Sequence, residues 1–161
     1  EQDLRILPIP TDRDTGAERI TAVSTKAAAG YALGYGDPDW IGSLPTFDLP
    51  LPEVPQDRSL RFFQIEGDSM LPLPSGTWIL CAFVERLEDV GSGRPYVVAT
   101  QEDGLVFKRV ENRLDEEGDL LLTSNNPLFA PFSLDPENVK EAWRAIGWFS
   151  TVWPSGPVAS S

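Results

Sequence analysis

The chain is organised around one short stretch, Phe62-Phe63-Gln64-Ile65-Glu66-Gly67-Asp68-Ser69-Met70. Apolar and polar side chains alternate as far as Glu66, which predicts a strand with one buried face. Gly67 permits a tight turn because it has no Cβ. Ser69 is therefore expected at the end of a rigid strand, where its hydroxyl can act as a nucleophile if a base removes its proton.

The base for that serine must be a lysine or a carboxylate, because the 161 residues contain no histidine and a Ser-His-Asp triad is excluded. Lys108 is the strongest candidate, since it lies in the apolar strand pattern of residues 104–110 with Val106 and Val110 on its own face. Desolvation lowers the pKa of a lysine, so that its neutral amine can act as a base. Arg109 falls on the opposite face and is expected in solvent or at an interface.

Several short motifs follow one another in a fixed order: Gly67-Asp68-Ser69-Met70, Pro72, Gly76, Phe107-Lys108-Arg109 and Leu122-Thr123-Ser124-Asn125-Asn126-Pro127. Together they resemble the LexA-like serine peptidase family, which includes LexA, UmuD and the cI-type phage repressors. The resemblance covers about residues 20–150. It implies a Ser-Lys dyad that cuts its own chain, with Ser69 as the nucleophile and Lys108 as general base and later general acid. Thr77 departs from the family pattern, because many relatives carry aspartate there.

Two further parts of the site follow from the turn and from the resemblance. Backbone N–H groups of Asp68, Ser69 and Met70 are the natural donors for an oxyanion, because no side chain of the motif is suited to that role. The family cuts an Ala-Gly or Cys-Gly bond upstream of the serine. The Ala29-Gly30 bond resembles that site and is the expected scissile bond.

Each of these residues also has an ordinary structural interpretation. Ser69 fits a turn serine that caps the backbone, and Lys108 fits a strand lysine that points to solvent. Ala29-Gly30 fits a flexible glycine loop. Asn125 and Asn126 are expected to cap their local backbone.

The composition limits the partners and the compartment. The formal net charge of −12 repels phosphate, so this segment is a poor candidate for holding nucleic acid by itself. Cys81 is the single cysteine, which allows no internal disulfide and suits a reducing cytoplasm. Cys81 lies in the apolar run 78–84, which is far shorter than the ~20 residues of a membrane span. We expect no cofactor, no metal site and no membrane segment.

The expected fold is mainly β, a LexA- or signal-peptidase-like β-ribbon or partly open barrel with one or two short helical turns. After a strand at residues 20–24, strands are predicted at about 60–66, 77–84, 95–101, 104–111, 118–123 and 141–152. Asp103-Gly104 is the best hairpin signal in the chain. Single helical turns are predicted after Asp37 and near Pro136, whereas the glycines of segment 26–36 argue against a stable helix there.

The domain organisation and the function are expected from the same resemblance. Residues 1–19 are interpreted as a linker from a preceding domain, expected to be a helix-turn-helix, 20–152 as a peptidase and dimerisation domain with the cleavage segment 26–36, and 153–161 as a tail. The resemblance implies a cytoplasmic bacterial or prophage repressor that binds operator DNA only through that preceding domain. It also implies cleavage upon DNA-damage signalling, with a RecA filament on single-stranded DNA as the co-protease.

The homodimer and two rival functions complete the predictions. The aromatic-rich final strand, 142–152, is expected to contribute to a homodimer contact through residues 143–149. One rival is a non-catalytic sensor or dimerisation module of a helix-turn-helix regulator on the same scaffold. The other is a Ser-Lys processing peptidase that acts in trans.

Overall fold

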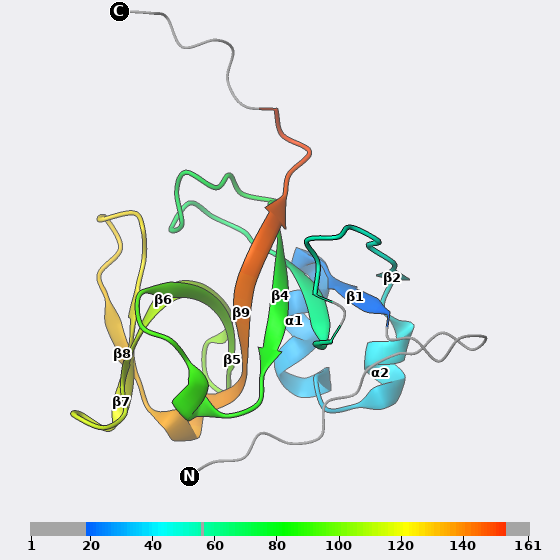
Figure 1. The fold of residues 1–161 in the computed structure, drawn as a ribbon. Helices are drawn as coiled ribbons and strands as arrows, with labels where there is room; N and C mark the ends of the chain where they lie inside the picture. Colours follow the sequence, from blue (N-terminus) through cyan, green and yellow to red (C-terminus); the bar gives the residue numbers. More distant parts are fainter. Residues whose placement is uncertain (1–18, 56, 154–161) are drawn as a thin grey trace, which may run out of the picture.

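The computed structural model describes residues 19–55 and 57–153 (Figure 1). The linker expected at 1–19 lies outside the described residues apart from Arg19, as does the tail expected at 153–161 apart from Trp153. A short edge strand or linker predicted at residues 4–10 also lies outside them.

The described residues form one open sheet of nine strands, in the order β2-β1-β3-β4-β9-β5-β6-β7-β8 (Figure 1). Neighbouring strands are antiparallel except for β1 and β3, which are parallel. The strands are β1 (Ile20–Val23), β2 (Thr46–Phe47), β3 (Leu60–Gln64), β4 (Trp78–Val84), β5 (Arg94–Thr100), β6 (Gly104–Arg113), β7 (Asp119–Thr123), β8 (Phe132–Leu134) and β9 (Val139–Phe149). The prediction of a mainly β fold is confirmed.

Local turn chemistry explains how the strands are connected. Gly104 has a φ of 67° at the turn between β5 and β6, a conformation that suits glycine. The hairpin predicted at Asp103-Gly104 is therefore confirmed. Gly118, with a φ of 74°, plays the same part between β6 and β7.

The helices are few and short: α1 (Thr25–Gly34), α2 (Pro38–Ser43) and the 3₁₀ turns η1 (Leu87–Asp89) and η2 (Pro136–Asn138). The two predicted helical turns, after Asp37 and at Pro136, are confirmed as α2 and η2. No helix within residues 19–55 and 57–153 has the length and apolar character needed to cross a membrane.

The prediction against a helix in segment 26–36 is wrong, because most of this segment belongs to α1. Ser24 caps the helix by accepting a hydrogen bond from the Ala27 amide at 3.2 Å. The glycines that argued against a helix are places of close contact with α2. A Cβ on Gly34 would lie 2.5 Å from the Trp40 ring, and one on Gly30 would lie 3.4 Å from it. Tertiary packing has overridden the low helix propensity of glycine.

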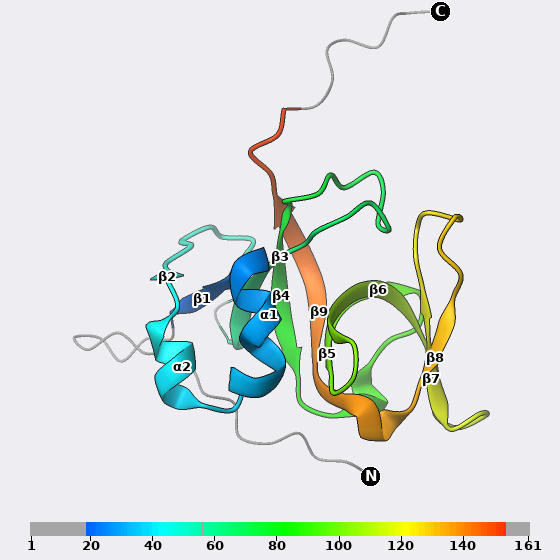
Figure 2. The same cartoon turned by 180° about the vertical axis from the view of Figure 1, so that it is seen from behind.

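The helix α1 lies in front of β3 and β4 in Figure 2 and closes one part of the core. This part contains Tyr31 from α1, Phe63 from β3 and Trp143 from β9. Their rings make edge-to-face contacts, with centroids 5.5 Å apart for Tyr31 and Phe63 and also for Phe63 and Trp143. These contacts fix α1 against the middle of the sheet.

The expected role of Trp143 in a dimer contact is wrong for the described chain, because its side chain is 0% exposed. Trp143 packs against Phe83 and Phe63, and the Arg61 guanidinium lies 4.8 Å from the centre of its ring. The exposed aromatic residues of this strand lie further on, at Trp148 and Phe149.

Candidate active site

Ser69 lies in a loop that leaves β3 and returns to β4. The loop is closed at its base, where the Ile65 amide donates to the Thr77 carbonyl at 2.9 Å and the Gly76 amide donates to the Ile65 carbonyl at 2.8 Å. The chain turns at Gly67, whose φ is 87°. The strand and the turn at Gly67 agree with the prediction, but β3 ends at Gln64, so Ser69 lies in the loop that follows the strand and not at the strand's end.

A second loop, after β7, holds the serine loop in place. The Asn126 amide donates to the Ser69 carbonyl at 2.9 Å, and its side-chain Nδ2 donates to the Asp68 carbonyl at 3.2 Å. Asn125 Nδ2 donates to the Leu71 carbonyl at 3.0 Å. The sequence predicted local capping for both asparagines, and Asn126 Oδ1 does accept from the Leu128 amide at 3.0 Å. The hydrogen bonds from Asn125 and Asn126 to the serine loop were not predicted, because they join residues far apart in the sequence.

Lys108 projects from β6 toward the same region. Its Nζ donates to Ser124 Oγ at 2.8 Å and lies 5.5 Å from the centre of the Phe129 ring. Burial lowers the pKa of Lys108 from its ordinary value, since desolvation disfavours the ammonium form. Arg109 is exposed on the opposite face and donates to Asn125 Oδ1 at 2.7 Å. This arrangement agrees with the alternation of side chains predicted for this strand.

Ser69 and Lys108 line one cavity of about 290 Å³. Its walls include apolar side chains from three parts of the chain: Phe63 of β3, Met70 of the serine loop, and Leu105 and Phe107 of β6. Within the described residues no hydrogen bond joins Lys108 to Ser69. The Lys108 ammonium donates its hydrogen bond to Ser124 Oγ instead. Catalytic hydrogen bonds are often long in the absence of a substrate, so the pair can still form when the site is filled.

The backbone around the serine offers free donors. The amides of Asp68, Ser69 and Met70 donate to no group among the residues that the structure describes. N–H groups in this state can stabilise an oxyanion that develops beside Ser69. A neutral Lys108 amine can take the Ser69 proton, and the resulting ammonium can return it to a leaving amine.

The expected scissile bond lies in α1, and α1 forms part of the same cavity. Thr25 and Ala28 line the cavity on its helical side. Ala29 is exposed, whereas Gly30 faces Trp40 of α2. The structure therefore brings this helix, Ser69 and Lys108 together, but it holds the Ala29-Gly30 bond in a helical conformation.

Ser124 is the site residue that the sequence analysis did not select. It is 9% exposed and is the only described hydroxyl that accepts from Lys108 Nζ. The motif Leu122-Thr123-Ser124-Asn125-Asn126-Pro127 had marked the segment, although nothing in it indicated which side chain meets the lysine.

Replacing Ser124 with alanine should slow the reaction of this site about tenfold, because a hydrogen bond that orients a charged group is worth roughly 1.5–3 kcal/mol. The loss of this acceptor also disfavours the ammonium form, so the pKa of Lys108 should fall. If the neutral amine is the base, the rate of the reaction should then begin to rise with pH at a lower pH than in the unmodified chain. Ser124→Thr, which keeps a hydroxyl, is the matched control. An unchanged rate and pH midpoint in Ser124→Ala would show that this contact does not orient the lysine.

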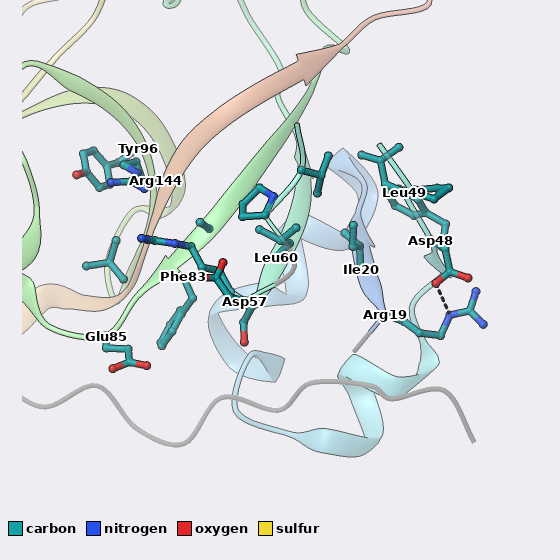
Figure 3. Close-up of a pocket in the computed structure, with 18 of the residues that line it drawn as sticks. Arg19, Ile20, Asp48, Leu49, Asp57, Leu60, Phe83, Glu85, Tyr96 and Arg144 are labelled. Carbon is teal, nitrogen blue, oxygen red and sulfur yellow. Dashed lines mark ion pairs between the residues drawn. The ribbon is translucent and has the colours of Figure 1, made fainter. Parts of the chain in front are cut away.

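A larger cavity of about 1150 Å³ lies away from this pair (Figure 3). It is lined by charged side chains of both signs, including Asp57, Glu85 and Arg144, and Arg19 pairs with Asp48 at 4.0 Å at one end. Neither Ser69 nor Lys108 lines it. Size alone therefore does not identify the reactive site.

Over the described part of the chain, no three His, Cys, Asp or Glu side chains are grouped so that they could hold a metal ion. Glu66 and Asp68 are both exposed, as expected for a solvated edge. The cavity is lined by the Ser69 hydroxyl and the Lys108 amine, and also by Thr25, Gln64 and Glu66.

The fold is a mainly β sheet that carries a serine and a lysine on one cavity. The model of the Peptidase S24-like family matches residues 24–149, and the chain belongs to this family. A search among curated proteins gives no match to the chain.

Proposed function

We propose that this chain is the self-cleaving and dimerising domain of a LexA- or cI-like transcriptional repressor of bacterial or prophage origin. Ser69 attacks the Ala29-Gly30 carbonyl, Lys108 is the base, and the amides of residues 68–70 stabilise the oxyanion. The observation that supports this most is the shared cavity of Ser69, Lys108 and the first turns of α1. DNA binding belongs to a preceding helix-turn-helix domain, and a RecA filament on single-stranded DNA is the proposed trigger.

The lowered pKa of Lys108 supports the same role. A partly apolar setting disfavours the charged form of a lysine, which is the form that a surface charge needs. A general base needs the neutral amine, and this setting makes that form easier to reach. Lys108 has no carboxylate partner among the described residues that would keep it charged. The surroundings thus make the neutral form, which can accept a proton, easier to reach than it is for an exposed lysine.

Concentration dependence tests whether the reaction is intramolecular. The purified chain should give two products, 1–29 and 30–161, with a rate constant that is unchanged over a wide range of protein concentration, because the substrate is tethered to its own site. Intact-mass spectrometry follows the products. A rate constant that rises in proportion to concentration would instead support the peptidase that acts in trans.

A second candidate is a non-catalytic regulator in which α1 permanently covers the cavity. It is favoured by the helical state of Ala29-Gly30 and by the contact of Gly30 and Gly34 with Trp40. Peptide segments that pair with a sheet edge bind in extended form, and a helical segment cannot pair in this way. Under this alternative the chain dimerises but stays intact at every pH.

The homodimer is proposed to form through the C-terminal end of β9. Apolar side chains gather there with large exposed fractions: Ile146 37%, Trp148 68%, Phe149 56%, Val152 57% and Trp153 91%. Exposed apolar groups of this size commonly mark a contact between proteins. The proposal replaces the buried Trp143 with the exposed residues that follow it.

Replacing both Trp148 and Phe149 with glutamate should raise the dissociation constant of the dimer by about 30-fold or more, since aromatic anchors of interfaces are worth roughly 2 kcal/mol or more. Sedimentation equilibrium measures the change. Leu33→Glu is the control, because Leu33 is 94% exposed on α1, away from this end of β9. Equal weakening by the control, or no weakening by the double variant, would place the interface elsewhere.

A further inference from the structure

Three consecutive residues of the loop after β7 contact both halves of the proposed reactive pair. Ser124 Oγ accepts a hydrogen bond from Lys108 Nζ at 2.8 Å. The next two residues, Asn125 and Asn126, donate hydrogen bonds to carbonyl groups of the serine loop. None of the three lines the cavity, so this segment supports the lysine and the serine backbone from outside it.

Asn126 holds two successive carbonyl groups beside the nucleophile. Its side-chain Nδ2 donates to the Asp68 carbonyl at 3.2 Å, and its backbone amide donates to the Ser69 carbonyl at 2.9 Å. Asn126 is itself well fixed, because it is 5% exposed and its Oδ1 accepts from the Leu128 amide at 3.0 Å. Both ends of its side-chain amide therefore have a partner, and the two partners distinguish the oxygen from the nitrogen.

The planar peptide bond converts these two contacts into the directions of two N–H groups. In a trans peptide unit, the C=O of one residue and the N–H of the next point in opposite directions. Both peptide bonds of Ser69 are trans. The Asp68 carbonyl points at Asn126, so the Ser69 N–H points away from it. The Ser69 carbonyl sets the direction of the Met70 N–H in the same way.

These two N–H groups belong to the side of the loop that faces the cavity. Ser69 and Met70 line the cavity, whereas Asn126 does not, so the serine loop lies between Asn126 and the cavity. Donors that are aimed before the reaction stabilise an oxyanion without a cost of reorganisation. A peptide unit whose carbonyl is held cannot rotate without breaking that hydrogen bond. Asn126 therefore keeps both donors in a fixed direction.

Asn125 makes the same kind of contact but directs no donor. Its Nδ2 donates to the Leu71 carbonyl at 3.0 Å, and its Oδ1 accepts from Arg109 Nε at 2.7 Å. The residue after Leu71 is Pro72, whose nitrogen carries no hydrogen. Asn125 thus anchors the serine loop without orienting an N–H group, which makes it an internal comparison for Asn126.

We propose that Asn126 is the positioning residue of the oxyanion donors. By holding the carbonyls of Asp68 and Ser69, it aims the N–H groups of Ser69 and Met70 at the carbonyl under attack. The proposal rests on the proposed function, since it concerns the donors of that same site. Asn126 acts only through the backbone of the serine loop.

The Ser69→Cys variant separates a reaction that needs these donors from one that does not. Its thiolate attacks the carbonyl of p-nitrophenyl acetate, an oxyanion forms, and p-nitrophenolate leaves while the acetyl group stays on sulfur. The same thiolate displaces iodide from iodoacetamide without forming an oxyanion. Cys81 does not compete, because it is 0% exposed. Intact mass measures both adducts, and the ratio of the two rates reports on the donors.

In the Ser69→Cys background, Asn126→Asp should slow acylation about tenfold to hundredfold and leave alkylation unchanged. The upper end approaches the loss of about 10²–10³ that follows removal of one oxyanion donor. The change keeps the acceptor for the Leu128 amide but replaces the donor to the Asp68 carbonyl with an oxygen that repels it. The rates are compared at alkaline pH, where the new carboxyl is ionised and cannot donate.

Two further asparagine-to-aspartate variants are the matched comparisons. Asn125→Asp keeps the acceptor for Arg109 and loses only the bond to the Leu71 carbonyl, so it should slow acylation several-fold less than Asn126→Asp. Asn138→Asp should change neither rate. Asn138 lies in η2, where its Oδ1 accepts from two backbone amides, and a carboxylate keeps these bonds.

The outcomes that overturn the proposal are distinct. Equal slowing of acylation and alkylation by Asn126→Asp would show a purely structural role, and so would an equal effect of Asn125→Asp. A Ser69→Cys thiol that is alkylated but not acylated, or that reacts with neither reagent, would show that no carbonyl reaches these donors. Asn126→Ala, which adds no charge, repeats the comparison if Asn126→Asp does not fold.

Self-cleavage gives a second readout when Ser69 is intact. Asn126→Ala should lower the plateau rate about tenfold or more but leave the pH midpoint in place, because the contact of Lys108 with Ser124 is untouched. A shifted midpoint with an unchanged plateau would contradict the proposal. If the unmodified chain stays intact at every pH, the proposed self-cleavage fails. The ratio of the two thiol reactions then still decides the role of Asn126.

Discussion

Self-cleavage should stop when Ser69 is replaced by alanine and when Lys108 is replaced by alanine or arginine. The alanine at position 69 removes the nucleophile, and the alanine at position 108 removes the base. Arginine at position 108 keeps the positive charge but does not lose its proton in the accessible pH range, so it cannot take the serine proton. Each change should slow the reaction by roughly three orders of magnitude or more.

These variants should keep the fold, which separates a chemical effect from unfolding. Within the described residues the Ser69 hydroxyl makes no hydrogen bond, and the Lys108 ammonium donates a hydrogen bond only to Ser124. Melting temperatures should therefore stay close to that of the unmodified chain. Ser133→Ala and Lys140→Ala are matched controls on β8 and β9 and should cleave at the normal rate. Continued cleavage in Ser69→Ala would point to a contaminating protease or to another nucleophile.

The rate of self-cleavage should rise with pH and then level off. Only neutral Lys108 accepts the serine proton, so the rate should increase about tenfold for each pH unit below its pKa and become constant above it. Burial lowers this pKa, so the midpoint should fall below the ~10.4 of an exposed lysine. Cleavage rates measured from neutral to alkaline pH give the midpoint.

Tyr31 is a buried residue of α1 whose phenol could also titrate in alkali. Burial is the main cause that raises the pKa of Tyr31 well above its ordinary value, and the negative charge of the Glu141 carboxylate is the second cause. Tyr31 therefore keeps its proton through the range in which Lys108 loses one. A rate that continues to rise without a plateau would indicate hydroxide-driven cleavage or unfolding. A rate that is independent of pH would remove Lys108 as the base.

The sequence was most informative where chemistry and local geometry coincide. Alternation predicted β3, the apolar run bounded by turn signals predicted β6, Gly67 predicted the turn before Ser69, and Asp103-Gly104 predicted the hairpin between β5 and β6. These signals depend on neighbouring residues only, so they can be read from one sequence. The resemblance inferred from the ordered motifs is confirmed by the match of the Peptidase S24-like family model to residues 24–149.

The features that were missed depend on contacts between distant residues. Gly30 and Gly34 look like helix breakers until Trp40 is placed against them. Trp143 looks like an exposed end-strand aromatic residue until Phe63 and Phe83 surround it. Asn126 looks like a residue that caps only its local backbone until the distant serine loop is placed beside it and accepts its hydrogen bonds. No local pattern contains such information, because it belongs to the packed state.

The central claim is that Ser69 and Lys108 form a reactive pair that cuts α1. Its most direct test is the intact mass of the unmodified chain beside Ser69→Ala, after both have been incubated at the alkaline plateau. The account predicts two products, 1–29 and 30–161, from the unmodified chain and a single intact mass from Ser69→Ala. An intact unmodified chain at every pH, or the same products from both proteins, would contradict it.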